Sequence, residues 1–160
     1  MLQAEDLSFI SKLSVFAGLE NSALELVGRL GARATHPDRT VLYREGEPAK
    51  DMVIVLSGRL DVVKRNDRGA EACIASLGPG DVAGEMSLID IQPRSAELRV
   101  VGETSVIVLS HKHLADIYNH DRDAYLLLVL NIAREISLRL RRVDEVLAKL
   151  IFEIGRNTSK

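Results

Sequence analysis

The spacing of hydrophobic positions changes twice along the chain, which divides it into three zones. From Ala4 to Leu30, apolar residues recur at steps of three, as they do on one face of a helix. Ser22 and Glu25 are typical of a capping box, so we expect two helices here, the second beginning near Ser22. Residues 1–34 are therefore predicted to be helical.

Residues 35–110 show a different pattern, with short runs rich in Val and Ile that each end in Gly, Pro, Asn or Asp. Short strands at regular spacing are typical of an antiparallel β jelly-roll barrel. The runs predicted to be strands are Thr40–Tyr43, Met52–Leu56, Leu60–Lys64, Glu71–Leu77, Ala96–Val101 and Ser105–Leu109.

The helical period returns over residues 111–154. We expect a short helix at Lys112–Tyr118 and then a long one, capped by Asp121 and ending near Ile154. Apolar positions in the long helix alternate steps of three and four, close to a coiled-coil seam. At ~1.5 Å per residue this helix is ~50 Å long and exceeds a small barrel, so part of its stripe is expected to contact a second copy.

Residues 155–160 are predicted to be a tail. The fold class is thus a single mainly β domain over residues 1–160, with N-terminal helices, a jelly-roll barrel and a long C-terminal helix.

Composition excludes several classes of function. A chain of 160 residues with 46% hydrophobic content fits one domain, and a net charge of −2 provides no global attraction to nucleic acid or an anionic membrane. No run approaches the ~18 apolar residues of a membrane span, and the first residues do not resemble a signal peptide. The single cysteine, Cys73, is expected to be a small buried residue of a strand. We therefore expect a cytoplasmic protein.

The segment from residue 84 to 96 interrupts the strands and carries the candidate chemistry. Gly84 allows close approach of the backbone to a ligand, and Glu85–Ile89 has room for a short helix whose free N–H groups attract an anion. The fork of Arg94 can bond phosphate oxygens, and Ser95 adds a hydroxyl. Glu85 is an acceptor suited to a sugar hydroxyl. The segment predicts a site for a sugar phosphate.

Two blocks here match a known pattern, Gly84-Glu85-Met86-Ser87-Leu88 and Arg94-Ser95-Ala96. They resemble the phosphate-binding cassette of cyclic nucleotide-binding domains of the cAMP receptor protein type. Upstream, Glu45-Gly46-Glu47, Met52–Gly58 and Gly78-Pro79-Gly80-Asp81 are similar to the strands and turns of the same family. The resemblance covers about Val15 to Leu147.

The resemblance implies roles for individual residues. Glu85 would bind the ribose 2′-hydroxyl, and Arg94 would pair with the cyclic phosphate of cAMP or cGMP. The expected ligand-binding residues are Gly84, Glu85, Met86, Ser87, Arg94, Ser95 and Ala96. The expected base-facing residues are Val62, Ile74, Leu77 and Ala83, where Ala83 replaces a frequent Phe and leaves more room. Candidates for a base contact from the long helix are Arg134, Ser137 and Arg139.

Other interpretations remain open at this point. Arg94 could instead be a surface residue paired with Asp90 or Glu97. No catalytic residues and no metal site are predicted, because the strand zone holds only His36 near its start.

We expect a regulatory module, not an enzyme, that signals to an unknown downstream protein when its C-terminal helix moves. The alternative is the effector domain of a transcription regulator that lacks or has lost its helix-turn-helix, since only Ile151–Lys160 follows Lys149. No DNA contact by this chain is expected.

Overall fold

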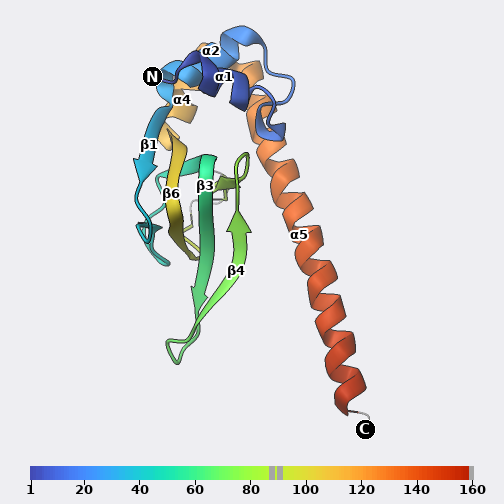
Figure 1. The fold of residues 1–160 in the computed structure, drawn as a ribbon. Helices are drawn as coiled ribbons and strands as arrows, with labels where there is room; N and C mark the ends of the chain where they lie inside the picture. Colours follow the sequence, from blue (N-terminus) through green and yellow to red (C-terminus); the bar gives the residue numbers. More distant parts are fainter. Residues whose placement is uncertain (87–88, 90–91, 159–160) are drawn as a thin grey trace.

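The computed structural model describes residues 1–86, 89 and 92–158, and the side chains of all of these except 157 and 158. Three short helical elements come first: α1 (Ala4–Ile10), the 3-10 helix η1 (Ser14–Phe16) and α2 (Asn21–Leu30). They cluster at one end of the molecule beside α4 (His111–His120) and the start of α5 (Arg122–Thr158) (Figure 1).

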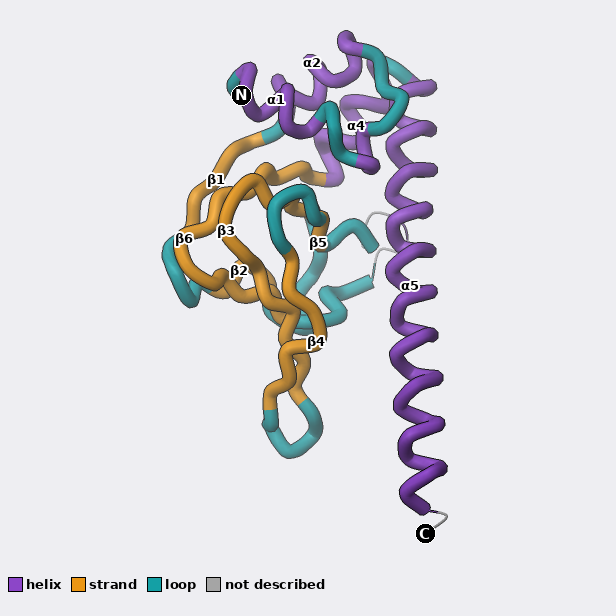
Figure 2. The backbone as a smooth tube through the Cα atoms, turned by 45° about the vertical axis from the view of Figure 1, so that its right-hand side comes forward, coloured by secondary structure: helices purple, strands orange, loops and turns teal. Residues whose placement is uncertain are grey.

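The strands form one antiparallel sheet in the order β1-β6-β3-β4, in which β2 pairs with β6 and β5 pairs with β3. Figure 2 shows the strands curled beside α5, which runs along one side and continues past them. The predicted mainly β fold with flanking helices and a long C-terminal helix is confirmed. The bounds are β1 (Ala32–His36), β2 (Val41–Tyr43), β3 (Asp51–Arg65), β4 (Glu71–Leu77), β5 (Val82–Ala83) and β6 (Glu97–Ser110).

Two pairs of predicted strands are each one long strand in the structure. The predicted turn at Ser57-Gly58 is instead a bulge within β3. The predicted turn at Gly102-Glu103 likewise lies within β6. Gly58 has a φ of +85°, and a Cβ there would overlap Thr104 of the facing strand. Glycine at this position therefore lets β3 pass close to β6 and bend without ending.

The core has two parts. The first lies between the helices and the sheet and includes Ile10, Phe16, Ile107 and Leu128, each no more than 1% exposed. The second lies inside the curl of the strands and includes Val55, Leu60, Val100 and Val106. Each large side chain buried in this way stabilises the fold by about 1.5–3 kcal/mol. The first part fixes the N-terminal half of α5, and the second forms the wall that supports the site.

The predicted cap of α5 is confirmed, because Asp121 Oδ1 accepts a hydrogen bond of 2.9 Å from the Ala124 N–H. Beyond Ile136 the helix leaves the core, and its apolar side chains become exposed. These include Leu140, Val143, Leu147, Leu150 and Ile154, each at least half exposed. Even so, no helix among the described residues is long and apolar enough to cross a membrane.

Four local predictions were wrong. β1 begins at Ala32, inside the range expected to be helical, because it pairs with the far part of β6. The Ser22–Glu25 capping box does not form, since α2 starts one residue earlier with Glu20 at its N-cap. Cys73 is exposed, as are its neighbours in β4 from Glu71 to Ser76. The long helix passes Ile154 and ends at Thr158.

Candidate functional site

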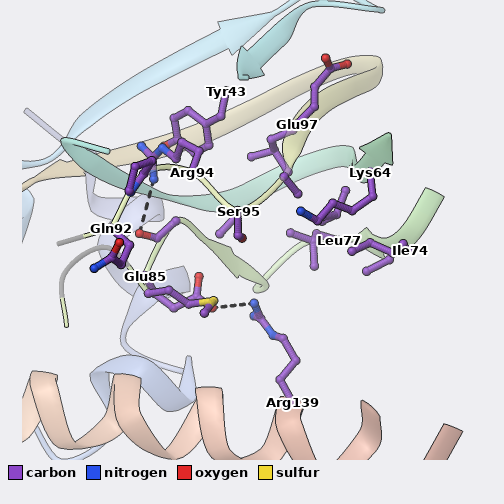
Figure 3. Close-up of a pocket in the computed structure, with 18 of the residues that line it drawn as sticks. Tyr43, Lys64, Ile74, Leu77, Glu85, Gln92, Arg94, Ser95, Glu97 and Arg139 are labelled. Atoms are coloured by element: carbon purple, nitrogen blue, oxygen red, sulfur yellow. Dashed lines mark hydrogen bonds and ion pairs between the residues drawn. The ribbon is translucent and has the colours of Figure 1, made fainter. Parts of the chain in front are cut away.

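A cavity of about 330 Å³ opens between the sheet and α5. The β3 and β4 strands supply an apolar wall, and the segments on both sides of residues 87–91 supply most of the polar groups. Figure 3 shows Arg94 and Tyr43 at one end of the cavity and Ile74, Leu77 and Lys64 at the other. Arg139 reaches into it from α5. The helix α5 and the segments on both sides of residues 87–91 thus line the same cavity.

Arg94 is buried, with 8% of its surface exposed, and is held on two sides. Its Nη2 donates to Asp51 Oδ1 at 2.7 Å, and its guanidinium lies 3.5 Å from the centre of the Tyr43 ring. The Tyr43 hydroxyl also donates to Asp51 Oδ1, at 2.7 Å. Burial and the nearby Asp51 raise the pKa of Tyr43, so its phenol stays protonated and remains a donor. The guanidinium is therefore fixed before any ligand arrives.

Of the two alternative partners expected for Arg94, Glu97 is not paired with it in the structure. Glu97 pairs with Arg65 and Arg99 instead, and Asp90 lies outside the described residues. Sequence reasoning missed both Asp51 and Tyr43. Asp51 is 43 residues from Arg94, and only the pairing of β3 with its neighbours brings the two together.

Gly84 is placed where a side chain cannot fit. Its φ is +81°, and a Cβ there would overlap Arg94 Nη1 and lie 3.0 Å from the Asp51 carbonyl oxygen. The carbonyl of Gly84 faces the same guanidinium, with Arg94 Nη1 at 3.5 Å from its oxygen. Glycine is thus required for both backbone conformation and space.

Glu85 is a second buried charge in the lining, with 3% of its surface exposed. Its Oε1 accepts from Arg139 Nη1 at 2.7 Å, and Arg139 Nη2 donates to the Val82 carbonyl at 2.8 Å. Burial raises the pKa of Glu85, and the attraction of Arg139 only partly offsets this effect. One side chain of α5 is therefore tied to the carboxylate and to the backbone of the cavity.

Most of the residues predicted for ligand binding lie together in the lining. They are Gly84, Glu85, Met86, Arg94, Ser95 and Ala96, whereas Ser87 lies outside the described residues. The expected short helix also falls largely outside them, although the Ile89 N–H donates to the Met86 carbonyl at 2.9 Å. The residues predicted to face a base, Val62, Ile74, Leu77 and Ala83, line the same cavity.

The three residues of the long helix that were candidates for a base contact differ in where they lie relative to the cavity. Arg139 lines the cavity, whereas Arg134 donates to Asn131 Oδ1 at 2.9 Å, away from the lining. Ser137 is not among the described residues of the lining either. No cluster of three or more His, Cys, Asp or Glu side chains suited to a metal ion is present among the described residues.

The arrangement suits an anion with an apolar body and a hydroxyl group. Arg94 provides a fixed cation at one end, Glu85 an acceptor, and the β3–β4 wall an apolar surface. This is the chemistry of a sugar phosphate that carries a planar base.

Comparison with known proteins agrees with this class of site. The family model for the cyclic nucleotide-binding domain matches residues 34–121, so the chain belongs to that family. It is 31% identical over 144 residues to the cyclic AMP receptor protein of Thermus thermophilus, covering 89% of this chain and 64% of that one. It is 27% identical over 143 residues to a CRP-like cAMP-activated global transcriptional regulator of Mycobacterium tuberculosis, covering 89% of this chain and 62% of that one.

Solved structures show the same fold. A cyclic nucleotide-binding domain from Methylobacillus flagellatus superposes with a TM-score of 0.79 at 26% identity, covering 89% of this chain and 81% of that one. The catabolite activator protein of Thermus thermophilus superposes with a TM-score of 0.75 at 28% identity, covering 88% of this chain and 64% of that one. The chain spans less than two thirds of the length of the two regulators.

Proposed function

We propose that the chain binds a cyclic mononucleotide in the cavity and regulates a partner through α5. The observation that carries the proposal is that Arg94 and Glu85, both buried and of opposite charge, line one cavity of about 330 Å³. Each has one charged partner, Asp51 for Arg94 and Arg139 for Glu85, and both line a space of ligand size.

In this proposal the cyclic phosphate lies against Arg94, with the Ser95 hydroxyl and nearby N–H groups as further donors. Asp51 and Tyr43 keep the guanidinium in place, so little ordering is needed when the ligand binds. Glu85 accepts a hydrogen bond from the ribose 2′-hydroxyl. The base packs on Val62, Ile74 and Leu77.

Movement of α5 would transmit the signal. The Arg139–Glu85 ion pair links the helix to the cavity, and a sugar hydroxyl at Glu85 competes with that link. The hinge is Asp121, whose backbone is extended (φ −151°, ψ 98°) between the last turn of α4 and the first turn of α5. A ligand that alters the link thereby shifts the position of the helix.

A second function is favoured by the relatives. Two of them are named as cAMP receptor protein or cAMP-activated regulator, and the chain spans 64% and 62% of their lengths. The corresponding proposal is that this chain acts as the effector domain of such a regulator. Sequencing the gene beyond the codon for Lys160 tests it, since a following helix-turn-helix supports it and an immediate stop codon contradicts it.

Titration of the purified chain with cAMP and with cGMP by calorimetry tests the first proposal. We expect at least one nucleotide to bind, and Arg94→Leu to weaken binding by ~30-fold or more, because charge-assisted hydrogen bonds to the phosphate are lost. The Arg94→Lys variant keeps the positive charge but loses the planar guanidinium. Its affinity should therefore lie between that of the wild type and that of Arg94→Leu. Arg29→Leu on the exposed side of α2 is the matched control. Absence of binding, or an Arg94→Leu variant with wild-type affinity, contradicts the proposal.

A further inference from the structure

The cations in the described lining of the cavity are all paired with carboxylates. The lysine and arginine side chains of this lining are Lys64, Arg94 and Arg139. The ion pairs are Arg94–Asp51, Arg139–Glu85 and Lys64–Glu45, with N–O distances of 2.7, 2.7 and 2.5 Å. The described part of the lining therefore offers N–H donors to a ligand, but no positive charge without a negative partner.

Asp51 is the carboxylate beside the cation proposed to bind phosphate, and other contacts besides Arg94 hold it there. Its Oδ1 accepts hydrogen bonds of 2.7 Å from Arg94 Nη2 and from the Tyr43 hydroxyl. Its backbone begins β3 and pairs with Ser110 of β6. A phosphate that reaches Arg94 would therefore lie near Asp51 without displacing it.

Arg94 keeps donors for such a phosphate. A guanidinium carries five N–H groups. Nη2 donates to Asp51, and Nη1 lies 3.5 Å from the Gly84 carbonyl oxygen. These contacts engage only part of the N–H groups, so the others can donate to phosphate oxygens. Binding would then depend on hydrogen bonds and not on an excess of positive charge.

The charge of the phosphate decides how unfavourable its position near Asp51 is. A monoanion leaves the group formed by Arg94, Asp51 and the phosphate with one net negative charge, whereas a dianion leaves it with two. Arg94 has only 8% of its surface exposed, so water and salt screen the repulsion between Asp51 and the phosphate poorly. A second charge on the ligand therefore opposes binding at this position.

We propose that Asp51 is a specificity-determining residue that makes the cavity accept phosphodiesters and reject phosphate monoesters. The inference rests on the proposed function and deepens it, because it names the charge of the phosphate that the site selects. A 3′,5′-cyclic nucleotide is a phosphodiester and carries one negative charge. A 5′-nucleotide is a monoester, and its second ionisation near pH 6 gives it almost two charges at pH 7. The cyclic ligand is thus selected by its charge as well as by its ring.

Calorimetric titrations of the full chain at pH 8 and at pH 5 test the effect of ligand charge. At pH 8 the wild type is expected to bind a cyclic nucleotide more tightly than the 5′-nucleotide of the same base. At pH 5 the 5′-nucleotide has lost one charge and the cyclic nucleotide none, so the ratio of their affinities should shrink by ~10-fold or more. The ratio cancels changes in the protein that affect both ligands alike, such as protonation of Glu85. A ratio that is equal at both pH values assigns the selectivity to ring shape and overturns the inference.

Asp51→Asn tests the residue itself. The amide oxygen still accepts from Arg94 and Tyr43, but the negative charge is gone. At pH 8 the affinity ratio of cyclic nucleotide to 5′-nucleotide should fall by ~10-fold or more, chiefly because the 5′-nucleotide binds more tightly. Asp38→Asn is the matched control, since Asp38 also lies beside an arginine, Arg39 at 3.6 Å, but is absent from the described lining. The control should leave the ratio unchanged.

The outcomes separate this inference from the proposed function. If the wild type binds neither cAMP nor cGMP, both fail. If it binds a cyclic nucleotide but Asp51→Asn changes the affinities for both ligands by the same factor, only the inference fails, because Asp51 then merely positions Arg94. The Asp51 side chain is 31% exposed, so the variant is expected to fold, which melting curves verify. The comparison of the two pH values uses the wild type alone and stands even if the variant does not fold.

Discussion

Burial disfavours the ionised form of the Glu85 carboxylate more than the nearby Arg139 and Arg94 favour it, so its ionisation opposes folding. Its pKa in the folded protein is raised above 4.5, mainly by burial. Between 4.5 and the raised value the folded chain holds more protons than the unfolded one, so the free energy of unfolding falls as pH rises through this window. Above it, the full penalty for the ionised group is present.

Glu85→Gln tests this reasoning. Without ligand, we expect the variant at pH 7 to melt a few degrees above the wild type, because a neutral amide can still accept from Arg139. The difference should close as pH falls below 4.5, where the wild-type carboxyl is protonated in both states. Melting curves from pH 4 to 8 measure it. A variant that melts below the wild type at pH 7 would mean that the Arg139 ion pair outweighs the cost of burial.

At the residue scale, the sequence predicted the chemical groups of the site but not how they are held. Gly84, Glu85 and Arg94 lie close together in the chain, so their pattern could be recognised directly. Asp51 and Tyr43 fix Arg94 from distant strands, and no local spacing announces such contacts. Arg139 could only be one candidate of three, because helical periodicity alone does not reveal which turn of a long helix faces a cavity.

At the scale of elements, α5 is anchored by a polar side chain as well as by its apolar stripe. Asn131 is 3% exposed, and its Nδ2 donates to the Val15 carbonyl at 3.2 Å and to the Ala17 carbonyl at 2.9 Å. These carbonyls lie in η1 and just after it, where the chain turns toward α2. The amide therefore joins the N-terminal segment of the chain to the N-terminal third of α5.

Asn131→Ala should lower the free energy of unfolding by about 1–3 kcal/mol, because buried carbonyls lose their donor. Asn131→Asp is nearly isosteric but turns a carboxylate toward the same carbonyls, so it should be more destabilising above pH 5 and less so when protonated. Urea titrations with constant m-values measure both. A loss below ~0.5 kcal/mol for Asn131→Ala would show that water replaces the amide.

The strands show where element prediction from sequence stops. Alternation and turn residues located the strand segments, and Glu71–Leu77 was confirmed to the residue. Ser57-Gly58 looked like a turn because Gly and Ser interrupt the alternation, yet in the folded sheet the partner strand continues past them. Whether a glycine ends a strand or forms a bulge depends on the partner, which a local pattern does not contain.

At the scale of the whole molecule, α5 extends beyond the part that the rest of the chain covers. Its exposed apolar residues after Ile136 follow the steps of three and four that are typical of a coiled-coil seam. Contiguous apolar surface of this kind is rarely left in water, and the charged residues lie mostly on the other faces of the helix. We therefore expect two copies to associate along α5.

Leu147→Glu tests this association, because Leu147 is 53% exposed, lies within the stripe and is absent from the described lining of the cavity. The variant should sediment as a monomer at concentrations where the wild type is dimeric, since two like charges would face each other across a seam. Lys149→Glu introduces the same residue on another face of α5 and should leave the dimer intact.

Nucleotide affinity per chain should change little in the Leu147→Glu variant, because Arg94, Glu85 and Arg139 all belong to the same copy. A wild type that sediments as a monomer at every concentration would contradict the dimer. If the monomeric variant instead loses nucleotide binding along with the dimer, the cavity must be completed by the second copy, and the single-chain site argued above would be only half of the functional one.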